Sequence, residues 1–134
     1  MNEERNPWNL LLVGAGGIGT QLTELLVPAL RRVDLKGTIT LMDADVVEAT
    51  NLGHQRYTKD DIGLAKVSAI ARRLDDENST LRVKGVVENL RSAEQLDGYD
   101  LVVVCVDRPE PRRMVHAIDV PWLDVRCSGD GWMT

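Results

Sequence analysis

The chain of 134 residues is long enough to fold around one hydrophobic core, and we predict a single domain spanning residues 1–134. Its 43% hydrophobic and 28% charged residues are typical of a soluble globular protein and exclude a disordered or fibrous chain. The net charge of −5 argues against a nucleic-acid partner, and the apolar runs are too short to cross a membrane.

Predicted strands and helices alternate from the start of the chain. Residues 9–13 form an apolar run that is typical of a strand covered on both faces, and this run leads directly into the sequence GAGGIG. Apolar residues then recur at helical spacing over residues 18–30, and Pro28 is expected to kink or shorten the last turn of that helix. Residues 38–42 are predicted to form the second strand.

A polar stretch, residues 48–63, is too rich in Asn, Gly and Asp to be a regular core element. The elements predicted after it are a helix at 64–74, a strand at 81–87, a short helix at 92–96, a strand at 101–106, a helix at 112–118 and a strand at 122–125. Strands alternating with helices predict an α/β fold, a Rossmann-like doubly wound sheet that is mainly parallel and has helices on both faces.

The sequence GAGGIG lies between the first strand and the first helix. Gly14 permits a tight turn, Gly16 lets the backbone approach phosphate oxygens, and Gly19 lets the helix and the strand pack closely. The helix N-terminus offers unpaired N–H groups to an anion. A structural turn that binds nothing is the weaker interpretation, because the strand, loop and helix are all present in the required order.

Asp43 ends the second strand about 24 residues after Gly19, where a carboxylate can accept hydrogen bonds from ribose hydroxyls. An aspartate at the end of a strand can instead cap the turn that follows. Together, the glycine loop and Asp43 leave NAD, FAD, ATP and S-adenosylmethionine as candidate ligands.

The segment after Asp43 separates these ligands. It reads DADVVEATNLGHQR and is followed by IGLAK, and it resembles the enzymes that adenylate ubiquitin, ubiquitin-like proteins and sulfur-carrier proteins, the ThiF, MoeB and HesA family. The family pattern is a GxGGxG loop, a DxDxVxxSNLxRQ segment, an IGxxK helix start and a strand ending in Asp. The resemblance covers residues 10–132, and the matching residues are Gly14, Gly16, Gly17, Gly19, Asp43, Asp45, Asn51, Leu52, Gln55, Ile62, Gly63, Lys66 and Asp107.

In that family these positions bind ATP and Mg²⁺ while the C-terminal carboxylate of a partner protein attacks the α-phosphate and pyrophosphate leaves. The resemblance implies that the glycine loop, Asp43 and Asp45 bind the nucleotide, with Asp43 on the ribose. It also implies that Asn51 contacts the phosphates, that Lys66 neutralises phosphate charge and that Asp107 holds Mg²⁺.

Three of these residues also have a plainer interpretation. Lys66 would be an ordinary solvated lysine, Asn51 would close a turn, and Asp107 would cap the helix that follows it. The carboxyl ends of parallel strands are where ligands bind in open α/β sheets, which favours a functional role for Asp107.

The sequence departs from the family pattern in three places. His54 stands where the family has arginine, so its charge depends on pH, and Arg56 is a candidate to replace it. The chain ends where family members are about half complete, without their partner-docking surface and CxxC zinc pairs. The N-terminal helix that lends an arginine to a neighbouring subunit is absent or reduced to residues 1–9, where Arg5 is the only candidate.

Two functions stay open at this point. The first is ATP-dependent adenylation of a ubiquitin-like or sulfur-carrier protein, with Lys66, Asp107, His54 and Arg56 as the catalytic residues. The second is a reduced, non-catalytic family member that binds a nucleotide or a partner protein. A nicotinamide-dependent dehydrogenase is a distant third, because it has no use for the NLxxQ and IGxxK segments. We expect a homo-oligomer or a second subunit, since a half-length member should leave apolar surface uncovered.

The two cysteines lack the spacing of a disulfide framework or a zinc site. Cys105 lies in an apolar run and is predicted to be a small buried hydrophobic residue, whereas Cys127 lies near the expected active edge but matches no nucleophile of the family. Residues 1–9 are polar where a secretory signal would be basic and then apolar. These observations favour a reducing, cytoplasmic location.

Overall fold

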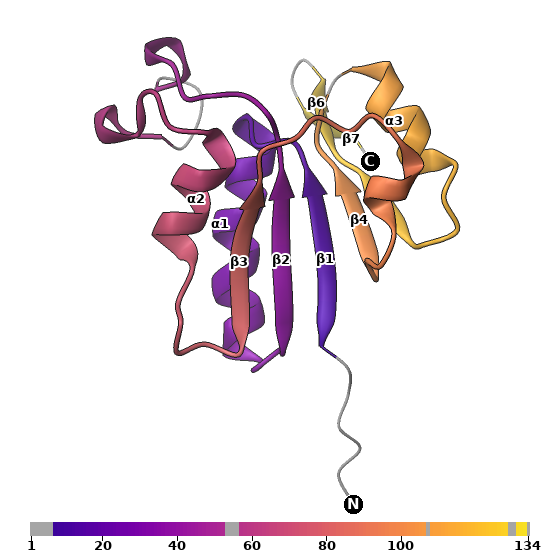
Figure 1. Ribbon diagram of the computed structural model, residues 1–134, viewed down its shortest axis with the longest axis horizontal. Helices are drawn as coiled ribbons and strands as arrows, with labels where there is room; N and C mark the ends of the chain where they lie inside the picture. The colour runs from indigo at the N-terminus through magenta and orange to yellow at the C-terminus, as the bar shows by residue number, and fades with distance from the viewer. Residues whose placement is uncertain (1–6, 53–56, 107, 129–130, 134) are drawn as a thin grey trace, which may run out of the picture.

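The computed structural model describes residues 7–52, 57–106, 108–128 and 131–133, with the backbone only for 126–128 and 131–133. Within these residues, five strands form a parallel sheet in the order β3-β2-β1-β4-β5 (Figure 1). The bounds of these strands and of the three α-helices are β1 Trp8–Val13, α1 Gly17–Arg32, β2 Gly37–Met42, α2 Lys66–Leu74, β3 Leu81–Val86, β4 Leu101–Val104, α3 Pro109–His116 and β5 Trp122–Asp124. The predicted doubly wound α/β class is confirmed.

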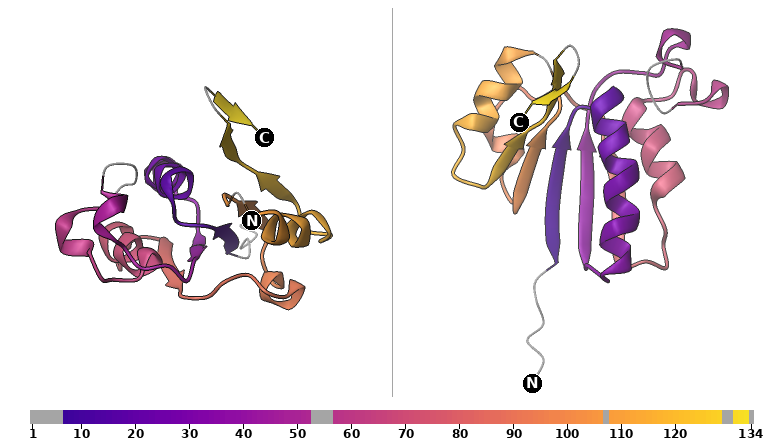
Figure 2. Two further views of the ribbon diagram at one scale, coloured as in Figure 1. Left: turned by 90° about the horizontal axis from the view of Figure 1, so that it is seen from above. Right: turned by 180° about the vertical axis from the view of Figure 1, so that it is seen from behind.

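The strands are apolar on both faces because each face is covered. In β1, Leu10 and Leu12 belong to the core cluster on one side of the sheet, while Leu11 and Val13 belong to the cluster on the other side. This alternation follows from the two-residue period of a strand. The first cluster packs against Val27 of α1 and helix α2, which lie next to each other in the view from behind (Figure 2).

The second core cluster packs under the short 3₁₀ helix η3 (Ala93–Leu96) and under α3, through Leu96 and Val115. The chain therefore runs outward from β1 to β3, returns to β4 beside β1, and continues outward to β5. The strand order reverses between β1 and β4. In open parallel sheets this reversal leaves a crevice at the carboxyl ends of the strands, where ligands bind.

The described residues between β2 and α2, 43–52 and 57–65, form no long element, as the sequence predicts. They include the 3₁₀ turns η1 (Ala49–Asn51) and η2 (Lys59–Asp61). The bridge between Val46 and Ala65 ties its two ends together. None of the helices in the described part of the chain is long and apolar enough to cross a membrane.

Three local predictions differ from the structure. Helix α1 is not shortened at Pro28 but continues to Arg32, with Pro28 at an exposed position, whereas the alternative expectation of a kink stays a prediction. Helix α3 starts at Pro109, three residues before the predicted start, because proline is favoured in the first turn. The glycine-rich tail forms an unpredicted antiparallel pair, β6 (Arg126–Ser128) and β7 (Gly131–Met133).

Arg31, in the last turn of α1, connects three elements. Its guanidinium donates to the carbonyl oxygens of Leu74 at 2.8 Å and Leu81 at 3.0 Å, and to the Ser79 hydroxyl at 3.0 Å. Leu74 ends α2, so this contact satisfies one of the carbonyls that a helix C-terminus leaves without an intrahelical partner.

We expect Arg31→Met to lower the free energy of unfolding by about 2–4 kcal/mol, because it removes three charge-assisted hydrogen bonds, two of them to main-chain carbonyls. The matched control is Arg32→Met, at an exposed neighbouring position, which should change the free energy by less than about 0.5 kcal/mol. Urea unfolding followed by circular dichroism measures both. Equal midpoints for the two variants would show that the Arg31 contacts do not stabilise the fold.

Candidate functional site

The candidate site lies at the carboxyl edge of the sheet, where the strand order reverses between β1 and β4. A shallow cavity there is lined by residues that follow four different elements. Gly14 follows β1, Asp43 follows β2, Glu88 and Asn89 follow β3, and Val106 follows β4. The sequence did not single out the Glu88–Asn89 contribution, because that segment carries no motif.

At two positions of the loop, the surrounding atoms leave room only for glycine. Gly14 has a φ of +109°, and a Cβ at this position would lie 2.7 Å from Val106 Cγ1. A Cβ at Gly19 would lie 2.1 Å from the Gly14 carbonyl oxygen. No side chain fits at either distance, so the loop passes directly beneath the end of β4 and against the first turn of α1.

The N-terminus of α1 points its free donors at this edge. Gly16 is the N-cap residue with extended backbone angles, and no side chain of the described residues caps the helix there. The first-turn N–H groups, including those of Gly17 and Ile18, have no intrahelical acceptor. Together with the positive end of the helix dipole, they form a site that suits an anion such as a phosphate.

The side chain of Asp43 bonds to the main chain of the glycine loop. Its Oδ2 accepts the N–H of Ala15 at 2.8 Å, and its Oδ1 accepts the N–H of Asp45 at 2.8 Å. The plainer interpretation, a cap for the following turn, is therefore correct as far as it goes. Each carboxylate oxygen keeps a second lone pair, with which it can accept a bond from a ribose hydroxyl.

Lys66 is buried, with 8% of its side chain exposed, so its interpretation as an ordinary solvated lysine is wrong. Its backbone N–H donates to the Asp45 carbonyl at 2.9 Å, which places the start of α2 beside the end of β2. Its ammonium lies 3.9 Å from Asp45 Oδ2, at the outer limit of an ion pair. A buried ammonium with such a distant counter-ion carries a desolvation cost that a bound anion would offset.

Asn51 closes its own turn. Its Oδ1 accepts the Glu48 N–H at 2.7 Å, and its N–H donates to the Glu48 carbonyl at 2.9 Å. The turn-closing interpretation is therefore right for the side-chain oxygen. The NH₂ group of the same side chain is the donor that a phosphate contact would use.

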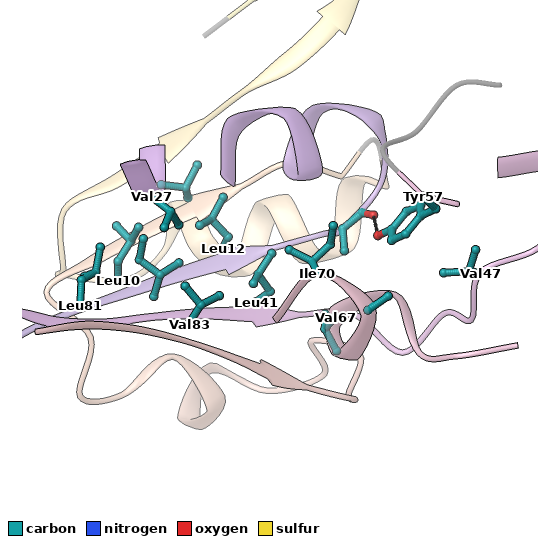
Figure 3. Packing of buried hydrophobic residues seen from close by; sticks show 14 residues of the cluster. Leu10, Leu12, Val27, Leu41, Val47, Tyr57, Val67, Ile70, Leu81 and Val83 are labelled. Atoms are coloured by element: carbon teal, nitrogen blue, oxygen red, sulfur yellow. Dashed lines mark hydrogen bonds between the residues drawn. The ribbon is translucent and has the colours of Figure 1, made fainter. Parts of the chain in front are cut away.

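Sequence reasoning missed Tyr57, although the structure shows it bonded to the glycine loop. Its ring is 6% exposed, and its hydroxyl donates to the carbonyl oxygen of Ala15 at 2.5 Å (Figure 3). Burial, with a smaller contribution from the Asp43 carboxylate, raises the pKa of the Tyr57 phenol well above its usual range. The only signal in the sequence was an aromatic residue within an otherwise polar stretch.

A second polar cluster lies at the carboxyl end of β5. Asp124 is buried there, and its Oδ2 accepts from Arg112 Nε at 3.0 Å and lies 2.9 Å from His116 Nε2. The His116 ring stacks on Trp122 with 4.1 Å between ring centroids. The sequence did not indicate these contacts, because they join a helix face to a strand end.

Cys105 follows β4 and is partly buried, in line with its interpretation as a small apolar residue. Burial, and secondarily the Asp124 carboxylate, raises the pKa of the Cys105 thiol to about 12. Of the other predicted site residues, His54, Arg56 and Asp107 lie outside the described residues, as does the Cys127 side chain. The structure therefore brings together the glycine loop, Asp43, Asp45 and Lys66.

This geometry can be compared with known proteins. Residues 6–127 match the sequence profile of the ThiF family. The chain belongs to the ThiF family. The family resemblance of the sequence motifs is thereby confirmed.

Two relatives of this chain are named as enzymes. The adenylyltransferase and sulfurtransferase UBA4 of Lodderomyces elongisporus is 31% identical over 126 residues, which cover 91% of this chain and 27% of that protein. Ubiquitin-like modifier-activating enzyme 5 of Drosophila persimilis is 31% identical over 121 residues, 79% of this chain and 30% of that protein. This chain thus spans less than a third of either relative.

The crystal structure of E. coli MccB with ATP superposes with a TM-score of 0.74 and 26% sequence identity, covering 88% of this chain and 37% of MccB. This similarity supports the parallel-sheet arrangement, and the MccB structure concerned contains ATP.

The raised pKa of Cys105 predicts slow alkylation. With a pKa of about 12, only about one thiol in ten thousand is ionised at pH 8, against roughly a quarter of ordinary cysteines. In a Cys127→Ser variant, we expect iodoacetamide to modify Cys105 on the order of a thousandfold more slowly in the native protein than in urea. The native rate should rise about tenfold per pH unit up to pH 10. Mass spectrometry follows both rates, and equal native and urea rates at pH 8 would contradict the burial of this thiol.

Proposed function

We propose that this domain binds ATP and activates the C-terminal carboxylate of a ubiquitin-like or sulfur-carrier protein by adenylation. The observation that carries the proposal is the buried Lys66, which contacts Asp45 in the segment that follows β2. A dinucleotide-binding domain needs the loop and Asp43 but has no need for a buried cation at this place. The names of the relatives, an adenylyltransferase and a modifier-activating enzyme, describe the same chemistry.

The described residues fit a nucleotide. The free N–H groups at the start of α1 would hold phosphate oxygens, and the second lone pairs of Asp43 would accept the ribose hydroxyls. Lys66 would offset phosphate charge, and the Asn51 NH₂ group would donate to a phosphate oxygen. Asp107 and the His54–Arg56 pair keep their proposed roles on the strength of the sequence motifs.

The proposed reaction brings two anions together. A carboxylate oxygen of the partner protein forms a bond to the α-phosphorus, and the bond from this phosphorus to the bridging oxygen breaks as pyrophosphate leaves. The ammonium of Lys66 and the helix N–H groups are fixed before the reaction, so they stabilise charge on the phosphoryl oxygens without reorganising. Mg²⁺, held by Asp107, would supply further charge neutralisation when bound.

We also propose that the working protein is an oligomer or a complex with a second chain. An apolar groove near the start of β1 is lined by Trp8, Leu10, Leu26, Leu30, Leu35, Ile39 and Leu101. Nearby, Leu123 of β5 is 50% exposed on the face of the sheet that α1 partly covers. Apolar surface of this kind favours association. The cytoplasm, a reducing compartment, is the location we propose for this complex.

The alternative is a non-catalytic family member that binds a nucleotide or a partner without turnover. The observation that favours it is His54 in the place of the family's arginine, because histidine is only partly charged at neutral pH. The two proposals agree on ATP binding and differ on pyrophosphate release.

The ligand proposal predicts that ATP binds more tightly than NAD, and that Lys66→Met weakens ATP binding by about 10- to 100-fold because one charge-assisted contact is lost. Lys84→Met, at an exposed lysine in β3, is the matched control and should leave ATP affinity unchanged. Titration calorimetry with ATP, NAD and adenosine measures these affinities. NAD binding equal to ATP binding, or a Lys66→Met protein with normal ATP affinity, would contradict the proposal.

The catalytic proposal predicts exchange of labelled pyrophosphate into ATP in the presence of a ubiquitin-like or sulfur-carrier protein with a free C-terminal carboxylate. Asp107→Asn should abolish this exchange, since it removes the proposed metal ligand. A carrier variant that lacks its last residues is the matched control. ATP binding without exchange, across the carriers encoded near this gene, would favour the non-catalytic member instead.

A further inference from the structure

Ala15 is the buried centre of the glycine loop, and two side chains from distant parts of the chain hold its main chain. Its N–H donates to Asp43 Oδ2 at 2.8 Å, and its carbonyl oxygen accepts from the Tyr57 hydroxyl at 2.5 Å. Asp43 is 28 residues away in sequence and Tyr57 is 42 residues away. The loop conformation is thus set by contacts from outside the loop.

The hydrogen bond from Tyr57 has a geometric consequence for the next residue. The peptide bond between Ala15 and Gly16 is planar and trans, so the Ala15 carbonyl and the Gly16 N–H point in opposite directions. Tyr57 draws the carbonyl toward the core cluster to which its ring belongs (Figure 3). The Gly16 N–H therefore points away from the Tyr57 hydroxyl.

Glycine makes this control necessary. Gly14 and Gly16 flank Ala15 and have no Cβ, so the backbone on each side can adopt several conformations at little cost. A rotated peptide would turn a carbonyl oxygen toward the phosphate site, where it would repel an anion. The Tyr57 hydroxyl disfavours that rotation, because the Ala15 carbonyl would lose its buried partner.

Tyr57 is itself held firmly at its own position. The next residue, Thr58, precedes the 3₁₀ turn η2, and its N–H donates to Asp61 Oδ2 at 2.8 Å. Tyr57 is 6% exposed, and its phenol, whose pKa burial raises further above physiological pH, is a hydrogen-bond donor.

We propose that Tyr57 is a positioning residue for phosphate binding, because its hydroxyl orients the Ala15–Gly16 peptide so that the Gly16 N–H faces the phosphates. The proposal rests on the nucleotide-binding function proposed above. It assigns to the polar segment between β2 and α2 a direct influence on the shape of the glycine loop.

The test is Tyr57→Phe, which removes only the hydroxyl and keeps the buried ring. Titration calorimetry should show ATP affinity falling by about 5- to 20-fold while adenosine affinity stays unchanged, since only the phosphates meet the Gly16 N–H. Tyr99→Phe makes the same chemical change in the second core cluster and should alter neither affinity. A purely structural role for Tyr57 predicts a lower melting temperature with the ATP-to-adenosine affinity ratio unchanged, and that result would overturn the proposal.

A second measurement needs no nucleotide. The ¹⁵N chemical shift of the Gly16 amide responds to the hydrogen bond on the preceding carbonyl, so Tyr57→Phe should move this resonance and Tyr99→Phe should not. If the natural protein fails to bind ATP, the nucleotide function fails, while a moved Gly16 resonance still supports the orientation of the peptide by Tyr57. An unmoved Gly16 resonance overturns that orientation whatever the binding results.

Discussion

The rest of the site depends on the two hydrogen bonds that the Asp43 carboxylate accepts. It ends β2, and its two oxygens accept one N–H from the glycine loop and one from Asp45. Asp45 in turn accepts the backbone N–H of Lys66 with its carbonyl. The Asp43 side chain thus links the loop after β1 to the segment after β2, and the main chain of Asp45 continues this link to the start of α2. The proposed nucleotide-binding groups lie at these three places.

This linkage carries a cost in stability. The N–H groups at the start of α1 face the open edge, Lys66 is buried at a distance from its counter-ion, and Gly14 has a backbone conformation that other residues rarely adopt. A ligand that binds only the folded state offsets such costs by mass action. Under the proposed function, the helix N–H groups and the buried Lys66 are the features that a bound phosphate would stabilise.

The glycine loop is restrained from three sides, which explains how a flexible sequence forms one shape. The end of β4 leaves no space for a side chain at Gly14, and the Gly14 carbonyl leaves none at Gly19. Tyr57 and Asp43 hold the peptide groups of Ala15 between these two glycines. Glycine supplies the conformational freedom, and these tertiary contacts restrict the loop to one conformation.

The sequence by itself determined the order of strands and helices, the doubly wound class, the glycine loop and the family, because these depend on local periodicity and on motifs read along the chain. It also placed Asp43, Asp45 and Lys66 in one site. It did not determine that Lys66 is buried, that Tyr57 reaches Ala15, or that Arg112 and His116 meet Asp124. Tertiary structure decided those outcomes. The hydrogen bonds join residues from different elements, and the burial of Lys66 depends on how α2 packs against the rest of the chain.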